Sequence, residues 1–176
     1  PIKKGKGVWL IDYDNNKYLD AISSWWVNLF GHSNTYINNK INKQLNSLEH
    51  VLLAGFTHMP AITLAERLIS LSPKKIKKCF FTDNGSSAID EAMKMSFHYW
   101  INKGYKKKKK FIALSNSYHG ETLGSLSVSN IDLYKKTYKS LMKETIIVPS
   151  PDSYFKEDKH TNKQHSKLMF DHMLKT

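Results

Sequence analysis

The segment Asp83-Asn84-Gly85-Ser86-Ser87 contains the residue types that bind a phosphate group. It lies between an extended apolar run and a stretch with helical periodicity. A helix N-terminus presents unpaired N–H groups and a partial positive charge, and both favour an anion. Glycine lets the backbone approach that anion, and serine hydroxyls add donors. Taken alone, the segment is more typical of an ordinary helix start with a serine cap.

A second polar segment, Ser117-Tyr118-His119-Gly120-Glu121-Thr122, follows the next predicted strand. In open α/β sheets, ligands bind outside the carboxyl ends of the strands, so both segments should lie at one edge. Tyr118 offers a flat face for stacking on a heteroaromatic ring. We therefore expect Tyr118 and Gly85 to face the same cavity, within roughly 10 Å of each other. Taken alone, this segment is typical of a loop with a buried tyrosine.

The pair Trp25-Trp26 follows two serines and places two large aromatic side chains next to each other. Aromatic rings dominate protein cores, so two core anchors are the ordinary expectation. The functional alternative is that one of these rings lines an apolar substrate tunnel.

The elements that must position these segments alternate in type. Residues 7–13 and 17–22 flank Asp14-Asn15-Asn16 and predict a β-hairpin. Apolar residues at helical spacing predict helices over 34–48 and 60–71. The spacing also predicts a helix over 87–102, ended near Gly104, whose apolar face is Ile89, Ala92, Met93, Phe97 and Trp100.

Three short apolar runs predict strands at 77–82, 111–115 and 145–148. A last helix is expected over 165–176, with the face Leu168, Met169, His172 and Met173. Strand, helix, strand, connection, strand is the order of an α/β domain with a largely parallel sheet. So few strands would leave an edge and a face uncovered, so the chain looks like a piece of a longer one.

Composition excludes several classes of protein. No apolar run is long enough for a membrane span, and no targeting leader is visible. The net charge of +12 permits nucleic-acid binding, but only Arg67 among 27 basic residues is arginine, which argues for biased composition instead. The lysine run 106–110 is expected to be a solvated loop. Cys79 has no partner cysteine and His119 no second ligand nearby, so neither a disulfide nor a metal site is expected.

Four motifs in order resemble the N-terminal part of class III aminotransferases, which depend on pyridoxal phosphate and have the type I fold. They are SSWWVNLFGH, LEHVLLAGFTHMPA, FFTDNGSSAIDEAMKM and SYHGETLGSLSV. SSWW with AGFTHMPA is most similar to the members that move an amino group from S-adenosylmethionine to 8-amino-7-oxononanoate, giving 7,8-diaminononanoate for biotin biosynthesis. The resemblance implies that residues 1–48 belong to the small domain and 49–176 begin the large, cofactor-binding domain. It also implies a cytoplasmic homodimer.

The resemblance implies a role for each matching residue. Gly85 and Ser86 are expected to hold the phosphate of pyridoxal 5′-phosphate. Tyr118 is expected to lie over the pyridoxal ring and to reach the substrate, and Trp25 to contact the substrate. Trp26 is expected to shape the same pocket, without a direct contact.

No catalytic residue is expected in this chain. The family's Schiff-base lysine, the aspartate at the pyridinium nitrogen and the substrate-binding arginine come from later segments, and none of the lysines here lies in a matching context. We expect these lysines to be surface-exposed, with pKa values near ~10.4, and the chain alone to be inactive. Three alternatives stay open: another class III aminotransferase acting on ornithine derivatives or ω-amino acids, a basic binding module without catalysis, and the product of a split gene.

Overall fold

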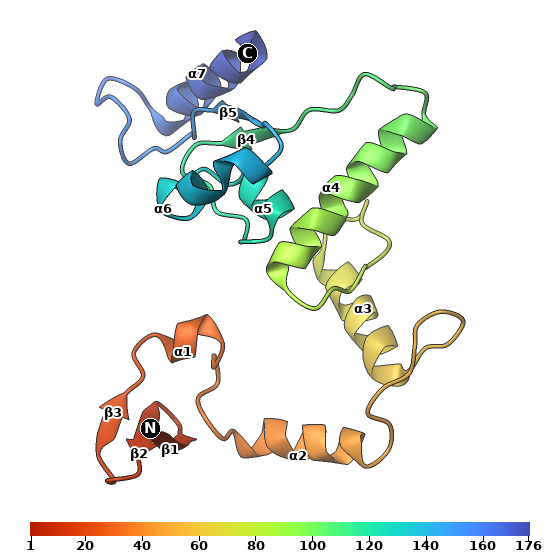
Figure 1. Cartoon of the computed structure of the whole chain (residues 1–176), viewed down its shortest axis with the longest axis vertical. Helices are drawn as coiled ribbons and strands as arrows, with labels where there is room; N and C mark the ends of the chain where they lie inside the picture. The colour runs from red at the N-terminus through yellow and green to blue at the C-terminus, as the bar shows by residue number, and fades with distance from the viewer. The chain divides into compact units, whose positions relative to one another are not determined.

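The computed structural model describes all residues from Pro1 to Thr176. The chain divides into two compact units, Pro1–Cys79 and Phe80–Thr176. Figure 1 shows the first in red to yellow and the second in green to blue. No helix is long and apolar enough to cross a membrane. The domain boundary after residue 48 remains a prediction, since it concerns the small and large domains that the resemblance implies.

The first unit begins with a three-stranded antiparallel sheet. Its strands are β1 (Ile2–Lys6), β2 (Trp9–Asp12) and β3 (Lys17–Leu19), in that order across the sheet. The predicted hairpin is confirmed as β2–β3, in which Leu10 lies opposite Tyr18. The Asp12 carboxylate closes its turn by accepting hydrogen bonds from Asn16 and Tyr18. Sequence reasoning missed β1, because the sequence IKKGK shows no apolar alternation.

Three helical segments complete this unit: α1 (Ser23–Trp26), α2 (Thr35–Leu45) and α3 (Met59–Leu71). The predicted helices over 34–48 and 60–71 are confirmed as α2 and α3. The Asn34 side chain caps α2 by accepting a hydrogen bond from the N–H of Ile37 at 3.1 Å. Pro60 lies in the first turn of α3, where its missing N–H costs nothing.

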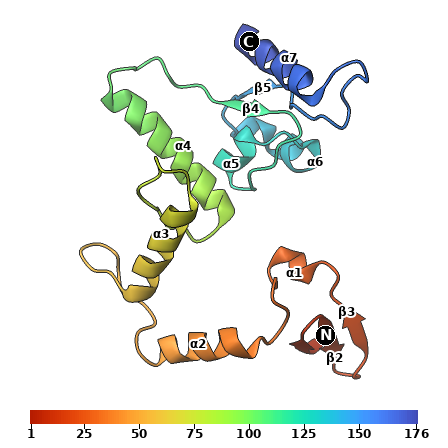
Figure 2. The same cartoon turned by 180° about the vertical axis from the view of Figure 1, so that it is seen from behind.

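The second unit is built on a parallel pair of strands, β4 (Ile112–Leu114) and β5 (Ile146–Val148). Before them comes the long helix α4 (Gly85–Asn102), and between them lie α5 (Leu123–Val128), α6 (Asp132–Lys135) and the 3₁₀ helix η1 (Lys136–Leu141). The helix α7 (Asn162–Lys175) follows. Figures 1 and 2 both show α7 on one side of the strand pair and α5 and α6 on the other. The unit is therefore layered α/β, as expected.

The buried core lies where α5 meets the strand pair. Its apolar members are Ala113 and Val148 from the strands and Leu126 and Val128 from α5. Three serines of α5 and its C-terminus are also buried, each bonded to a backbone carbonyl. The predicted apolar face of α4 is only half-buried at best, although α5 packs against that helix.

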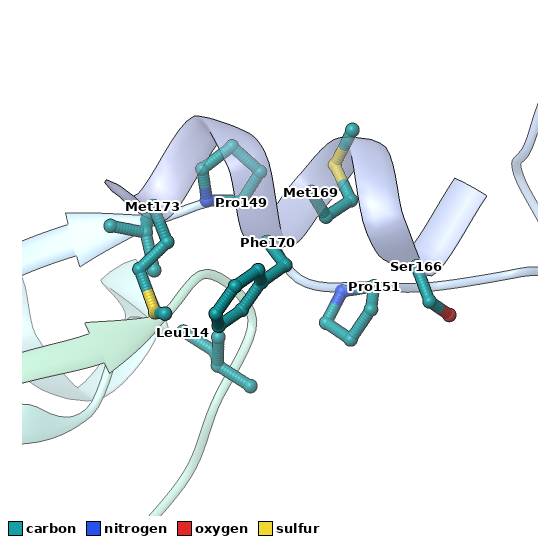
Figure 3. A pocket seen from close by; sticks show the side chains of 8 residues that line it. Leu114, Pro149, Pro151, Ser166, Met169, Phe170 and Met173 are labelled. Carbon is teal, nitrogen blue, oxygen red and sulfur yellow. The ribbon is translucent and has the colours of Figure 1, made fainter. Parts of the chain in front are cut away.

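Two details correct the expectations. Residues 77–82 were expected to form a strand, but they pair with no other segment, and an extended run without ladder hydrogen bonds is not a strand. The face of α7 was expected to include Leu168. Met169, Phe170 and Met173 line an apolar groove of about 220 Å³ beside Leu114 (Figure 3). Leu168 and His172, which were both expected on this face, lie outside the groove and are exposed.

Candidate functional site

An open cleft of about 490 Å³ lies at the N-terminus of α4. Its lining comes from the first turns of α4 and from the loop after β4: Asn84, Gly85, Ser86, Ile89, Tyr118, His119 and Gly120. The structure thus brings Gly85, Ser86 and Tyr118 together around one cavity, as the sequence predicted. The prediction assumed that both segments follow strands of one sheet. This is correct for Tyr118, which follows β4, and wrong for Gly85, because residues 77–82 form no strand.

The first turn of α4 leaves backbone donors free for a ligand. The Asn84 side chain accepts a hydrogen bond from the N–H of Ser87 at 2.8 Å and so caps the helix. The N–H groups of Gly85 and Ser86 have no acceptor within the helix, as in every first helical turn. A Cβ built on Gly85 would meet no heavy atom within 4 Å, so the space before these donors is open.

The loop after β4 approaches α4 very closely at Gly120. Its φ is +122°, and a Cβ here would lie 2.1 Å from the Ser86 Oγ and 2.7 Å from the Ser86 Cβ. A side chain at this position is therefore excluded both by conformation and by space. The close approach lets the N–H of Glu121 donate to the Ser86 Oγ at 3.1 Å. Since that hydroxyl accepts this bond, its own hydrogen stays free to donate to a ligand.

Tyr118 is oriented by two residues that sequence reasoning did not identify. Its hydroxyl donates to Glu121 Oε1 at 2.9 Å, and its ring contacts that of Tyr134 at 5.4 Å between centroids. The hydrogen bond to Glu121 raises the pKa of Tyr118 above its usual value, so the hydroxyl is protonated at neutral pH. Tyr118 is 51% exposed, so it is available to a ligand. The alternative expectation of a loop with a buried tyrosine is therefore wrong.

The residues that follow α5 hold this loop in place. The N–H of His119 donates to the Ser129 Oγ at 2.9 Å, and the N–H of Asn130 donates to the Ser117 carbonyl at 2.8 Å. His119 thus lines the cleft, but its backbone makes the contact that fixes the loop. The loop rests on the most buried part of the unit, which gives Tyr118 a rigid base.

Trp25 and Trp26 belong to the other compact unit and are not core residues. They are 68% and 75% exposed, and their rings lie 5.1 Å apart at 49°. The four residues Ser23–Trp26 all have left-handed φ values of 46° to 67°. Each non-glycine residue in this conformation costs about 1–2 kcal/mol. The expectation of two core anchors is therefore wrong for this chain, and the exposed rings remain available to a ligand.

Two lysines, Lys135 and Lys156, are less exposed than expected. Lys135 is half-buried, and its Nζ donates to the carbonyls of Ser127 at 3.0 Å and Ser129 at 2.8 Å. Burial lowers its pKa from the usual value. The lysine run 106–110 is exposed as predicted, with the Lys108 Nζ 3.4 Å from the centroid of the Trp100 ring. Lysines 107–110 line a cavity of their own, which shares no residue with the Tyr118 cleft.

Comparison with known proteins gives consistent results. The family model described as aminotransferase class-III matches residues 1–176. The adenosylmethionine-8-amino-7-oxononanoate aminotransferase of Helicobacter pylori is 52% identical over 152 residues, which are 86% of this chain and 34% of that protein. The chain thus spans about a third of this relative's length.

Two solved structures show the same fold. The crystal structure of adenosylmethionine-8-amino-7-oxononanoate aminotransferase from Methanocaldococcus jannaschii has a TM-score of 0.81 at 39% identity, over 85% of this chain and 34% of that one. An omega transaminase from Pseudomonas jessenii, in complex with PMP, has a TM-score of 0.88 at 28% identity, over 99% and 39%. The predicted α/β fold, that of the N-terminal part of a type I transferase, is confirmed.

Proposed function

The chain belongs to the class III aminotransferases, and from that membership we propose that it forms the N-terminal part of an enzyme of biotin biosynthesis. The proposed reaction transfers an amino group from S-adenosylmethionine to 8-amino-7-oxononanoate and gives 7,8-diaminononanoate. The observation that carries this proposal is the 52% identity to the Helicobacter relative, whose name states adenosylmethionine and 8-amino-7-oxononanoate. The exposed tryptophan pair and the cleft at α4 are consistent with it.

The proposed cofactor is pyridoxal 5′-phosphate, and the cleft at α4 fits such a group. Open space lies in front of Gly85, where a Cβ would meet nothing. A phosphate placed there would receive hydrogen bonds from the N–H groups of Gly85 and Ser86 and from the Ser86 hydroxyl, together with the positive end of the helix. When bound, the cofactor supplies the electron sink and the amino-group carrier for transamination.

Tyr118 acts as the second wall of this cofactor site in our proposal. Its exposed ring gives a flat surface on which the pyridoxal ring can stack. Glu121 and Tyr134 keep that ring in one orientation, which reduces the entropy lost when a ligand binds. Because its hydroxyl is protonated, Tyr118 is also able to donate a hydrogen bond to a substrate that displaces Glu121.

Trp25 is proposed to contact the substrate, and Trp26 to shape the same pocket. Both rings are exposed, so a long aliphatic substrate can remove apolar surface from water by packing on them. The Schiff-base lysine, the pyridinium aspartate and the substrate-binding arginine are expected outside this chain. The full enzyme is proposed to be a cytoplasmic homodimer that acts on small molecules and binds neither nucleic acid nor membranes.

The second candidate is an ω-amino-acid transaminase, favoured by the TM-score of 0.88 to the Pseudomonas protein. That protein is 28% identical, however, and overall superposition reports the fold rather than the substrate. Sequence identity reports more of the side chains that contact a substrate. It is 52% to the Helicobacter relative, so we prefer the first proposal.

Substrate preference tests the proposal. The chain is mixed with the C-terminal two-thirds of the Helicobacter relative and pyridoxal 5′-phosphate, and two reactions are compared. Formation of 7,8-diaminononanoate from S-adenosylmethionine is the expected result. Transfer from an ω-amino acid to pyruvate, without any diaminononanoate, would favour the second candidate. The chain without its complement is the control, and we expect it to catalyse neither reaction.

A further inference from the structure

The turn that carries Trp25 and Trp26 is anchored by one carboxylate. Asp20 Oδ1 accepts a hydrogen bond from the N–H of Ser24 at 2.8 Å, and Asp20 Oδ2 accepts one from the Ser24 hydroxyl at 2.7 Å. No glycine occurs among the four left-handed residues of this turn, so its conformation needs support from outside. Both side-chain hydrogen bonds of the turn end on Asp20.

Asp20 is itself held by residues outside the tryptophan turn. Its N–H donates to the Val8 carbonyl at 2.9 Å, and Oδ2 lies 2.7 Å from His32 Nε2. An ionised carboxylate can only accept hydrogen bonds, so the hydrogen of this pair lies on His32 Nε2. The Asp20 side chain is 6% exposed, whereas the two rings it supports stand in solvent. The carboxylate is thus beneath the turn and not available to a ligand.

His32 extends this support to the start of the chain. Its N–H donates to the Gly7 carbonyl at 2.8 Å, and the Gly7 N–H donates back to the His32 carbonyl at 3.0 Å. Its ring lies against Gly5, where a Cβ would come within 2.7 Å of the ring. The tryptophan turn and the loop around residue 32 therefore meet at the Asp20 carboxylate, and His32 in turn lies against Gly5 of β1.

We propose that Asp20, held by His32, is a positioning residue that sets the orientation of Trp25 toward the substrate by fixing Ser24. The role of Trp25 in this inference rests on the proposed function. Asp20 itself touches neither substrate nor cofactor. Removing its carboxylate leaves the N–H and the hydroxyl of Ser24 without their acceptors, and the left-handed turn then relaxes toward right-handed or extended backbone.

The tryptophan pair provides a spectroscopic test of the orientation. Two indoles 5.1 Å apart and inclined at 49° couple their transitions and give a circular-dichroism couplet, which Trp25→Phe identifies by removing it. We expect Asp20→Ala to lose the couplet and Asp20→Asn, which keeps one acceptor for Ser24, to retain part of it. Cooperative thermal denaturation checks folding. If Asp20→Ala fails to fold, the couplet of Asp20→Asn alone tests the proposal.

Asp12→Ala is the matched control. The Asp12 carboxylate is also covered and also accepts three hydrogen bonds, but from Asn16 and Tyr18 in the neighbouring hairpin turn. This variant should keep the couplet. A folded Asp20→Asn with an unchanged couplet would overturn the proposal, and so would loss of the couplet in Asp12→Ala to the same extent.

Kinetics with the complemented enzyme separates this inference from the proposed function. Asp20→Ala should raise the KM for 8-amino-7-oxononanoate more than it lowers kcat, as Trp25→Ala should. If Trp25→Ala leaves KM unchanged, the substrate role proposed for Trp25 is wrong. If Trp25→Ala raises KM and Asp20→Ala does not, the positioning role of Asp20 is wrong.

Discussion

Gly85→Val offers the sharpest test of the proposed phosphate site at Gly85 and Ser86. A Cβ at Gly85 meets nothing within 4 Å, so the chain has room for a side chain to begin at this position. The isopropyl group then fills the space in front of the N–H groups of Gly85 and Ser86. We therefore expect the variant to fold normally and to lose the site for the phosphate.

The size of the loss follows from the hydrogen bonds removed. A hydrogen bond to a charged group contributes about 1.5–3 kcal/mol, and the openness of the cleft to water argues for the lower end. Two such bonds give about 3 kcal/mol, which corresponds to a loss of roughly 150-fold in affinity. Gly85→Ala places only one methyl group in the same space and should lose less.

The assay compares two ligands that differ only in the phosphate. Binding of pyridoxal 5′-phosphate and of pyridoxal to the chain is followed by absorbance. The affinity for pyridoxal 5′-phosphate divided by the affinity for pyridoxal isolates the contribution of the phosphate. The ratio should exceed one for the original chain and fall toward one for Gly85→Val. A Gly85→Val chain that keeps the original ratio would refute the proposal that the phosphate binds at Gly85 and Ser86.

Gly120→Ala is the contrasting variant for the same cleft. Its Cβ would lie 2.1 Å from the Ser86 Oγ, at a φ of +122°. Strain and overpacking of this kind each cost about 1–3 kcal/mol of stability. Thermal denaturation should therefore show a lower midpoint for Gly120→Ala and an unchanged midpoint for Gly85→Val. A midpoint that falls for Gly85→Val and stays unchanged for Gly120→Ala would contradict the view that packing requires Gly120 and not Gly85.

Three further predictions concern charged residues. Replacing lysines 106–110 by serine should leave the affinity for pyridoxal 5′-phosphate unchanged, because these exposed lysines share no lining residue with the cleft; a large loss in the same absorbance titration would place their charge in the site. The pKa of Asp20 falls from 3.8 to about 2, first through the Ser24 hydroxyl, so the stability it contributes is present above pH 3.8 and is lost as the pH falls through 2. Acid denaturation of Asp20→Asn should lack this component, and an identical acid profile would contradict it. Borohydride reduction of the chain with pyridoxal 5′-phosphate should leave no stoichiometric pyridoxyl-lysine, even at Lys135, whose Nζ donates to two carbonyls; mass mapping of peptides would reveal an exception.

Most elements were predictable because their signals are local. The periods of the apolar residues and the turn residues around Asn15 and Gly104 depend only on neighbours in sequence, and α2, α3, α4 and the β2–β3 hairpin follow from them. A strand, in contrast, needs a partner. Residues 77–82 have the composition of a strand, but nothing in their own sequence states whether another segment pairs with them.

The candidate site was predictable at its main residues and not at their supports. Gly85, Ser86 and Tyr118 stood out because their residue types suit a phosphate and an aromatic ring. Glu121 lies three residues after Tyr118, a spacing that could have suggested its hydrogen bond. Tyr134 and the pairing of Asp20 with His32 gave no such signal, because contacts across 12 or more residues depend on the path of the folded chain.

Gly85 and Gly120 lie in the same cleft for opposite reasons. Gly120 is required by the chain itself, because its φ is positive and the Ser86 side chain occupies the place of any Cβ. Gly85 is required by nothing in the chain, since its surroundings are empty and the first turn of a helix tolerates most residues. A glycine that packing does not explain, at a helix start with free N–H donors, indicates that the empty space is needed by a bound group. The two glycines together therefore support our proposal that the space between Gly85 and Tyr118 receives the cofactor: the loop packs closely on the helix at Gly120, and the space at Gly85 stays open.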